Sequence, residues 1–255
     1  RSLVDEAKRR AAQSTGIPVE RMLVAATHTH SAPSVMGALG TPVDAEYAAL
    51  LPAWIAESIE RAAKNITAAR AGWIAVDAPL HTNCRRWIKR PDRIGTDPFG
   101  NATVRAMMHP GYQNPDFVGP AGPEDSGLTL LAVRARGDGP EKPGRIIAVL
   151  ANYSMHYIGA APVSADYFGR FCRRFAEQIG ADRLEPPVVA MMSQGTAGDL
   201  HWMDYSRPAK QIGLDAYADE VAKIASEAYR KIEFRDAPSL AMAERRLTLR
   251  RRTPD

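Results

Sequence analysis

Apolar residues recur along the chain in two patterns, one with the period of a helix and one typical of buried strands. The clearest helical pattern covers residues 44–69, where Asp44 is a candidate N-cap and Trp54 is expected on the core side. Similar patterns predict further helices over residues 2–14, 166–179 and 209–231. The helical patterns alternate with the strand-like runs along most of the chain.

Short apolar runs predict the strands. They cover residues 22–26, 73–76, 128–136, 145–153 and 188–192, and a last extended stretch covers residues 240–249. Residues 146–150 are apolar throughout, which indicates a strand buried on both faces, and residues 188–192 predict another buried strand. A turn is predicted at residues 137–140. Strands that alternate with helices predict an α/β fold, a layered domain with a mixed β-sheet flanked by helices.

Residues 89–126 differ from the rest of the chain. They are rich in Pro, Gly, Asp and Asn and show little periodicity. A connection of this length in a compact domain is usually functional. We therefore expect one domain over residues 1–255, with residues 89–126 as a long covering loop.

Composition narrows the classes of function. Of the 255 residues, 45% are hydrophobic and 24% are charged, as in ordinary globular proteins. No apolar run approaches the roughly 20 residues of a membrane span, and the first residues lack the apolar core of a signal peptide. The net charge is only +4 and no basic face is interleaved with aromatic residues, so we expect no nucleic-acid partner. Two cysteines, Cys84 and Cys172, leave the compartment open, and the oligomeric state is also open.

Candidate chemistry begins at residues 27–31, which read Thr-His-Thr-His-Ser and follow the predicted strand at 22–26. Side chains alternate along an extended segment, so His28 and His30 are expected on the same side. Two such imidazoles suit a divalent metal, or one can ligate while the other handles a proton or an oxyanion. For this motif alone, two ordinary loop histidines are an equal alternative.

Three predicted strands end in polar clusters. The clusters contain His28 and His30, then residues 152–156 with Asp166, and then residues 193–201. In open α/β sheets, sites form beyond the carboxyl ends of strands. One cleft is therefore predicted to contain His28, His30, His156, Asp166, Asp199 and His201. Ser154 and Ser193 are expected to bond to the backbone, because the sequence contains no nucleophile elbow.

Taken in order, these segments resemble the neutral/alkaline non-lysosomal ceramidase family. Residues 27–33 are similar to its Thr-His-Thr-His-Ser-Gly-Pro signature. Residues 152–156 and 164–166 resemble its second histidine segment, and residues 194–199 resemble its Gly-Asp loop. Residues 82–86 resemble its Asn-Arg segment, and residues 114–123 resemble its covering loop. The similarity extends over residues 5–250.

Members of that family are zinc-dependent amidases that hydrolyse the N-acyl bond of ceramide. The resemblance implies Zn²⁺ ligands at His28 and His156, with His30 and Arg85 lining the site and stabilising an oxyanion. A one-residue slip would put Arg86 in the place of Arg85. Asp166 and Asp199 are expected to orient histidines or loop backbone. The implied reaction is hydrolysis of a small-molecule or lipid-like amide, by a water that the metal activates.

The chain departs from the family in two ways. The family has a serine shortly after its Gly-Asp pair, whereas this chain has His201 there. This favours metal-activated water over a serine step, leaves ceramide itself open as substrate, and gives His201 the expected role of proton donor to the leaving amine. The family's other ligands, a Glu and a Tyr, fall downstream of the matched region. We therefore expect a segment of a longer chain, incomplete at both ends.

Two other functions fit the same sequence features. A non-catalytic binding protein could keep the fold without the chemistry. A metal-dependent esterase or phosphoesterase could use the same histidines.

Overall fold

The computed structural model describes residues 2–137 and 144–250. The chain divides into two compact units. The helical unit comprises Arg1–Val24, Pro33–Thr67 and Pro238–Asp255, and the sheet unit comprises Ala25–Ala32 and Ala68–Ala237. The single domain expected over residues 1–255 stays a prediction. The turn predicted at residues 137–140 falls largely outside the described residues and also stays a prediction.

The helical unit is built on α1 (Ser2–Thr15) and α2 (Ala45–Lys64), which pack against each other and bury Ala11 and Ala56 between them. Both helices were predicted. The Asp44 carboxylate accepts the main-chain N–H of Tyr47 at 3.0 Å, so the predicted N-cap is confirmed. The prediction for Trp54 is wrong, because its side chain is 48% exposed.

No strand forms over residues 22–26, so that prediction is wrong. Leu23 is 73% exposed and finds no strand to pair with. The last stretch, residues 240–249, likewise carries no assigned strand. Apolar runs of this length need a neighbouring strand to form a ladder, and a sequence pattern does not show whether one is present.

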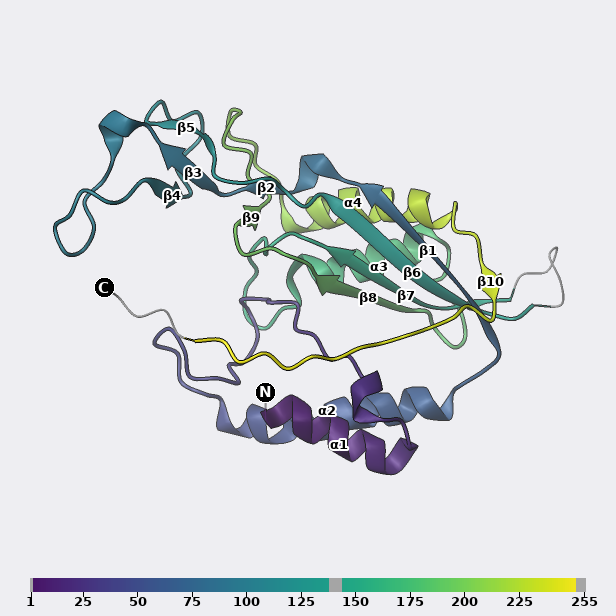
Figure 1. The fold of residues 1–255 in the computed structure, drawn as a ribbon. Helices are drawn as coiled ribbons and strands as arrows, with labels where there is room; N and C mark the ends of the chain where they lie inside the picture. Colours follow the sequence, from purple (N-terminus) through teal and green to yellow (C-terminus); the bar gives the residue numbers. More distant parts are fainter. Residues whose placement is uncertain (1, 138–143, 251–255) are drawn as a thin grey trace. The chain divides into compact units, whose positions relative to one another are not determined.

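The sheet unit contains a five-stranded sheet with the order β10–β1–β6–β7–β8 (Figure 1). The strands are β1 (Ala69–Asp77), β6 (Gly127–Ala135), β7 (Ile146–Tyr153), β8 (Val189–Gln194) and β10 (Arg235–Asp236). Neighbours are antiparallel except β7 and β8, which are parallel. The mixed α/β sheet expected from the sequence is confirmed.

Two helices, α3 (Asp166–Gln178) and α4 (Leu214–Tyr229), pack together against one face of this sheet (Figure 1). Leu128 and Leu130 of β6 point into this layer, where Phe171 and Phe175 of α3 and Val221 of α4 are fully buried. The helix α3 connects β7 to β8, so its N-terminus and the ends of both strands lie at the same edge of the sheet.

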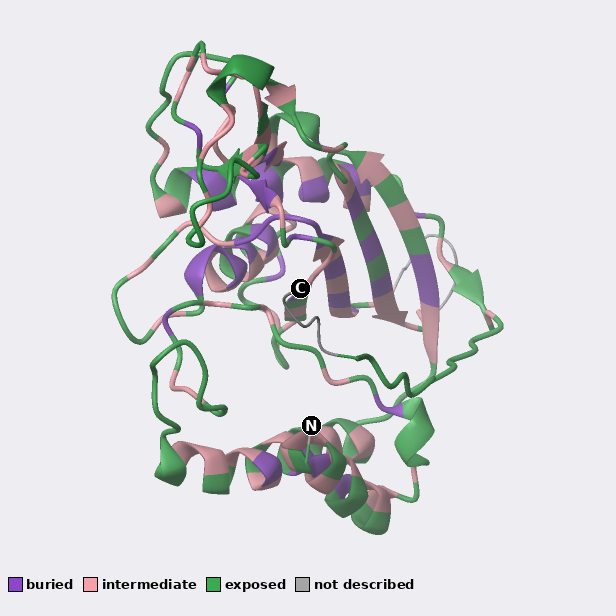
Figure 2. Ribbon diagram, turned by 60° about the vertical axis from the view of Figure 1, so that its left-hand side comes forward, coloured by how far each residue is buried: buried purple, intermediate pink, exposed green. Residues whose placement is uncertain are grey.

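The opposite face of the sheet is only partly covered. The prediction of a buried strand is wrong for β8, where Val189 and Met191 are exposed, whereas no residue of β7 is exposed. One cross-strand row on that face contains Trp73, Leu131, Leu150 and Met191. Trp73 is 51% exposed and Met191 is 45% exposed, and exposure alternates along β6 (Figure 2). The apolar runs are real, but only the face under α3 and α4 is fully buried.

Short strands extend the fold beyond the main sheet. β2 (Asn83–Cys84) pairs with β9 (Leu200–His201), and β3 (Arg86–Lys89) lies between β4 (Ala106–Met108) and β5 (Phe117–Pro120). Single 3₁₀ turns cover Val19–Arg21, Pro79–His81 and Pro91–Arg93. Residues 89–126 thus contain two strands that their composition did not indicate, whereas a covering role for the segment stays a prediction.

Candidate metal centre

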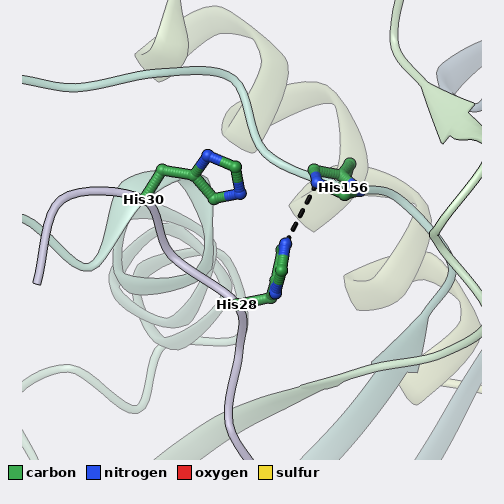
Figure 3. Close-up of side chains that lie close together, drawn as sticks. All are labelled: His28, His30 and His156. Carbon is green, nitrogen blue, oxygen red and sulfur yellow. Dashed lines mark hydrogen bonds between the residues drawn. The ribbon is translucent and has the colours of Figure 1, made fainter. Parts of the chain in front are cut away.

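Three histidines from distant parts of the sequence meet in the sheet unit. His28 and His30 lie on one segment, and His156 follows β7. One ring nitrogen of each lies within 4.8 Å of the others, and the Nε2 atoms of His28 and His156 are 3.1 Å apart. Figure 3 shows His28 pointing at His156, with the His30 ring beside the pair. The structure therefore brings together the two ligands implied by the resemblance and the third histidine next to them.

The backbone of the first histidine pair is not the extended strand that the sequence suggested. His28 has a φ of +60°, a left-handed conformation that is uncommon for residues other than glycine. The rings of His28 and His30 nevertheless approach to 4.7 Å between centroids. The two rings share one side because of this turn and not because of strand alternation.

Hydrogen bonds fix this segment to the chain that follows His156. The hydroxyl of Thr29 donates to the Ser164 carbonyl at 2.9 Å, and the hydroxyl of Ser31 donates to the Ala160 carbonyl at 2.7 Å. The main-chain N–H of Ser164 returns a bond to the Ser31 carbonyl at 3.0 Å. The hydroxyls of Thr29 and Ser31 thus keep His28 and His30 close to His156.

The His156 ring is oriented by a carbonyl oxygen. Its Nδ1 lies 2.8 Å from the Ala197 oxygen, so Nδ1–H donates and Nε2 keeps a free lone pair toward His28. Burial lowers the pKa of His156, as does the charge of Arg85, whereas the Ala197 bond opposes the shift. Burial, His28 and Arg85 also lower the pKa of His30. Neutral imidazole is the form that binds metals.

These residues fit a zinc ion. Zinc binds histidine nitrogen at about 2.0–2.1 Å in tetrahedral geometry, which separates two ligand nitrogens by about 3.3 Å. The distance of 3.1 Å between the His28 and His156 nitrogens is close to this value. The oriented lone pair of His156 also favours metal binding. The lowered pKa values of His30 and His156 favour it as well, because they keep both rings neutral.

His30 differs from the other two in its surroundings. Its ring stacks on Tyr157, with centroids 3.8 Å apart and an interplanar angle of 20°; like His28, the residue is exposed. The Tyr157 ring also lies 5.2 Å from His156 and 5.7 Å from His201. Sequence reasoning missed Tyr157, although its position directly after His156 was a signal that could have found it.

The structure brings Arg85, and not Arg86, to the centre. The Arg85 guanidinium donates to the Gly198 carbonyl at 2.7 and 3.2 Å, and its main-chain N–H donates to the Asp199 carbonyl at 2.7 Å. Its charge lowers the pKa values of His30 and His156. Arg86 is exposed on β3 and pairs with β4.

The two aspartates have different surroundings. Asp166 is buried, and its carboxylate accepts the main-chain N–H groups of Ile158, Gly159 and Tyr167 at 2.7–2.9 Å. It therefore holds the backbone that follows His156. Asp199 offers its main-chain oxygen to Arg85, and its carboxylate has no hydrogen bond within residues 2–137 and 144–250.

His201 is 4% exposed and lies opposite Asn83 in the β2–β9 pair. Burial, reinforced by His109 and Arg85, lowers the pKa of His201 to about 3. A ring with this pKa is neutral at pH 7, which counts against the expected role as proton donor there. Its Nδ1 is buried without a hydrogen-bond partner among the described residues.

His109 is a neighbour that sequence reasoning missed. Its ring lies 5.5 Å from the His201 ring, its Nδ1 lies 2.5 Å from the Tyr205 hydroxyl, and its main-chain N–H donates to the Arg85 carbonyl at 2.9 Å. It comes from the segment rich in Pro and Gly, where no strand or motif singled it out.

Comparison with solved structures finds the same fold in two ceramidase structures. One is the neutral ceramidase from Pseudomonas aeruginosa, with a TM-score of 0.59 and 16% identity over 90% of this chain. The other is a ceramidase complexed with C2, with a TM-score of 0.56 and 16% identity, again over 90% of this chain. This chain spans about a third of each ceramidase chain, 34% and 33% respectively.

No family model matches the chain, and no curated protein sequence matches it significantly. The ceramidase-like fold expected from the motifs is confirmed at the level of the fold. Among the described residues, no helix has the length and apolar content needed to cross a membrane.

Proposed function

We propose that this chain carries the metal centre of a zinc-dependent hydrolase that cleaves an amide bond. The observation that carries the proposal is the His28–His156 contact, with His30 in reach of the same point. The ceramidase-like fold supports amide chemistry over other metal-dependent reactions. The substrate class is a small-molecule or lipid-like N-acyl amide.

His28 and His156 are the proposed ligands, because their Nε2 atoms face each other and the Ala197 carbonyl fixes the His156 ring. Zinc bound there would lower the pKa of a bound water to about 7 and polarise an acyl carbonyl. Asp166 keeps the chain after His156 in place through three N–H bonds. Asp199 supports Arg85 through its main-chain oxygen.

Arg85 and His30 are the proposed donors to the substrate oxygen that becomes negative during amide cleavage. Arg85 has a fixed positive charge that the Gly198 carbonyl holds in place, and His30 is held by its stack on Tyr157. Removing one such donor typically costs about 100-fold or more in rate. We propose that His201 contributes hydrogen bonding as a neutral ring and does not act as a covalent nucleophile.

The proposal is tested with the 255-residue chain loaded with zinc, the same chain stripped by a chelator, and a His156→Ala variant. Each is assayed on an N-acyl aminocoumarin amide, the matched coumarin ester and a coumarin phosphate. We expect amide turnover that zinc restores and that His156→Ala lacks.

Zinc binding without turnover of any of the three would overturn the hydrolase proposal in favour of a binding protein. Turnover confined to the ester or the phosphate would overturn the amide assignment. Amide turnover that survives complete removal of zinc would overturn the metal-dependent mechanism.

A further inference from the structure

The loop over residues 194–199 presents main-chain oxygens to both sides of the metal centre. Ala197 accepts the Nδ1–H of His156, and Gly198 accepts the Arg85 guanidinium. The Gln194 amide donates to the carbonyls of Met155 and His156 at 3.1 and 2.8 Å. The position of this loop therefore sets the orientation of a proposed metal ligand and of a proposed oxyanion donor.

One carboxylate from the segment at 89–126 is bonded to this loop. Asp125 accepts the hydroxyl of Ser154 at 2.5 Å and the hydroxyl of Thr196 at 3.2 Å, both on Oδ2. The Ser154 hydroxyl in turn accepts the main-chain N–H of Thr196 at 3.0 Å. Ser154 is fully buried, so its hydroxyl is committed to this network.

We propose that Asp125 is a positioning residue of the metal centre, acting through Ser154 and Thr196 on the loop that orients His156 and Arg85. This inference rests on the proposed function for its chemistry. The carboxylate is needed because both of its oxygens accept: Oδ2 takes the two hydroxyls, and Oδ1 takes the main-chain N–H of Gly127 at 3.4 Å. An amide in its place would turn its N–H₂ group toward one of these donors.

The loop also leaves no space between itself and Ser154. A Cβ added at Gly195 would collide with the Ser154 hydroxyl and lie 3.3 Å from the Asn152 amide oxygen. The hydrogen bonds that Asp125 accepts therefore act on a loop that already packs closely against Ser154, directly after β7. A small displacement of Thr196 would also move the next residue, Ala197, whose carbonyl oxygen accepts the Nδ1–H of His156.

The test compares Asp125→Asn with Asp97→Asn in the full chain. Asp97 is a matched control, because its carboxylate accepts bonds from Phe99, Asn101 and Thr103 in the same segment. Among the described residues it forms no hydrogen bond with the 194–199 loop. Nitrogen-15 NMR of labelled histidines, in metal-free protein, reports whether the His156 proton sits on Nδ1. Titration with Co²⁺ then reports metal affinity.

We expect Asp125→Asn to convert the single His156 tautomer to a mixture and to weaken Co²⁺ binding by about 10–100-fold. Asp97→Asn should leave both unchanged. A second variant, Thr196→Val, removes one donor to Asp125 and should give a smaller change in the same direction, which covers the case in which Asp125→Asn does not fold.

A wild-type His156 tautomer in both Asp125→Asn and Thr196→Val would overturn the positioning role. The tautomer is read without metal, so it decides this proposal separately from the proposed function. Failure of the wild-type chain to bind Co²⁺ or Zn²⁺ would count against the metal centre and leave the tautomer result intact.

Discussion

The Nε2 atoms of His28 and His156 lie 3.1 Å apart, although the two residues are 128 positions apart in the sequence. Without a metal, two neutral imidazole nitrogens at this distance must share one proton, because two lone pairs in contact repel each other. The Nδ1–H of His156 already donates to the Ala197 carbonyl, so the proton between them comes from His28. A divalent metal can replace that proton.

Removing either member of this pair should weaken metal binding more than removing the third histidine. We expect His28→Ala and His156→Ala to lose stoichiometric zinc. His30→Ala should retain most of it and lose rate instead, because a donor to the transition state contributes little to metal affinity. Zinc content by elemental analysis and Co²⁺ titration measure the first effect.

A suitable control for this series is His81→Ala. His81 bonds to the Glu220 carboxylate at 2.9 Å and is not part of the histidine cluster. Loss of zinc from His30→Ala to the level of His28→Ala would make His30 a third ligand and contradict the division proposed here.

The second prediction separates two adjacent arginines. Arg85→Met should lower turnover by about 100-fold or more, because it removes a fixed cation next to the histidines. Arg86→Met should leave turnover close to wild type, since Arg86 is exposed on β3. Steady-state kinetics on the amide substrate measures both. Equal losses in the two variants would show that the charge acts at long range and not through the Gly198 contact.

The third prediction concerns acid stability. The pKa of His201 falls from its ordinary value of 6.5 to about 3 in the folded chain. The unfolded chain therefore binds more protons between these values, so stability falls as the pH drops from about 6.5 toward 3. For this group alone the loss between pH 7 and pH 4 is on the order of 3 kcal/mol.

Urea unfolding at pH 7 and pH 4 measures this effect. The wild-type chain should lose more stability between the two values than His201→Gln, whose side chain does not titrate. Identical losses in both proteins would show that His201 is hydrated or charged in the folded state. That result would also restore His201 as a proton donor at neutral pH.

Much of the fold follows from local patterns. The strands β1, β6, β7 and β8 and the helices α1 to α4 have apolar repeats that fix their type, and Asp44 marks the start of α2. Burial was harder to predict. The sequence around Trp54 and Met191 does not show whether another element packs on them, and both residues are in fact exposed. An apolar stripe therefore indicates the type of element more reliably than it indicates burial.

The site residues that belong to recognisable motifs could be predicted from the sequence. Those placed by strand pairing or by long-range hydrogen bonds could not. His28, His30 and His156 come from motifs that tertiary structure brings together. Arg85 and Arg86 cannot be told apart by spacing, because the β2–β9 pairing selects which of them faces the loop. Asp125 and His109 lie in a segment without periodicity, and only long-range hydrogen bonds connect them to the centre.

The last prediction tests the tight contact between the 194–199 loop and the end of β7. Gly195→Ala should destabilise the chain by about 1–3 kcal/mol, because its Cβ would collide with the Ser154 hydroxyl and the neighbouring strand cannot move freely. Gly198→Ala is the matched control, since nothing lies within 4 Å of a Cβ built there. Its stability should change by less than about 0.5 kcal/mol. Urea unfolding at pH 7 measures both.

A double variant identifies the atom responsible. Ser154→Ala removes the hydroxyl that the new Cβ would meet, so adding it to Gly195→Ala should cost less than the sum of the two single changes. Strict additivity would show that Ser154 is not the obstacle. Co²⁺ affinity should change in the same way: Gly195→Ala should bind Co²⁺ most weakly, and Gly198→Ala should bind it nearly as tightly as wild type. The reason is that displacement of the loop moves the Ala197 oxygen away from His156.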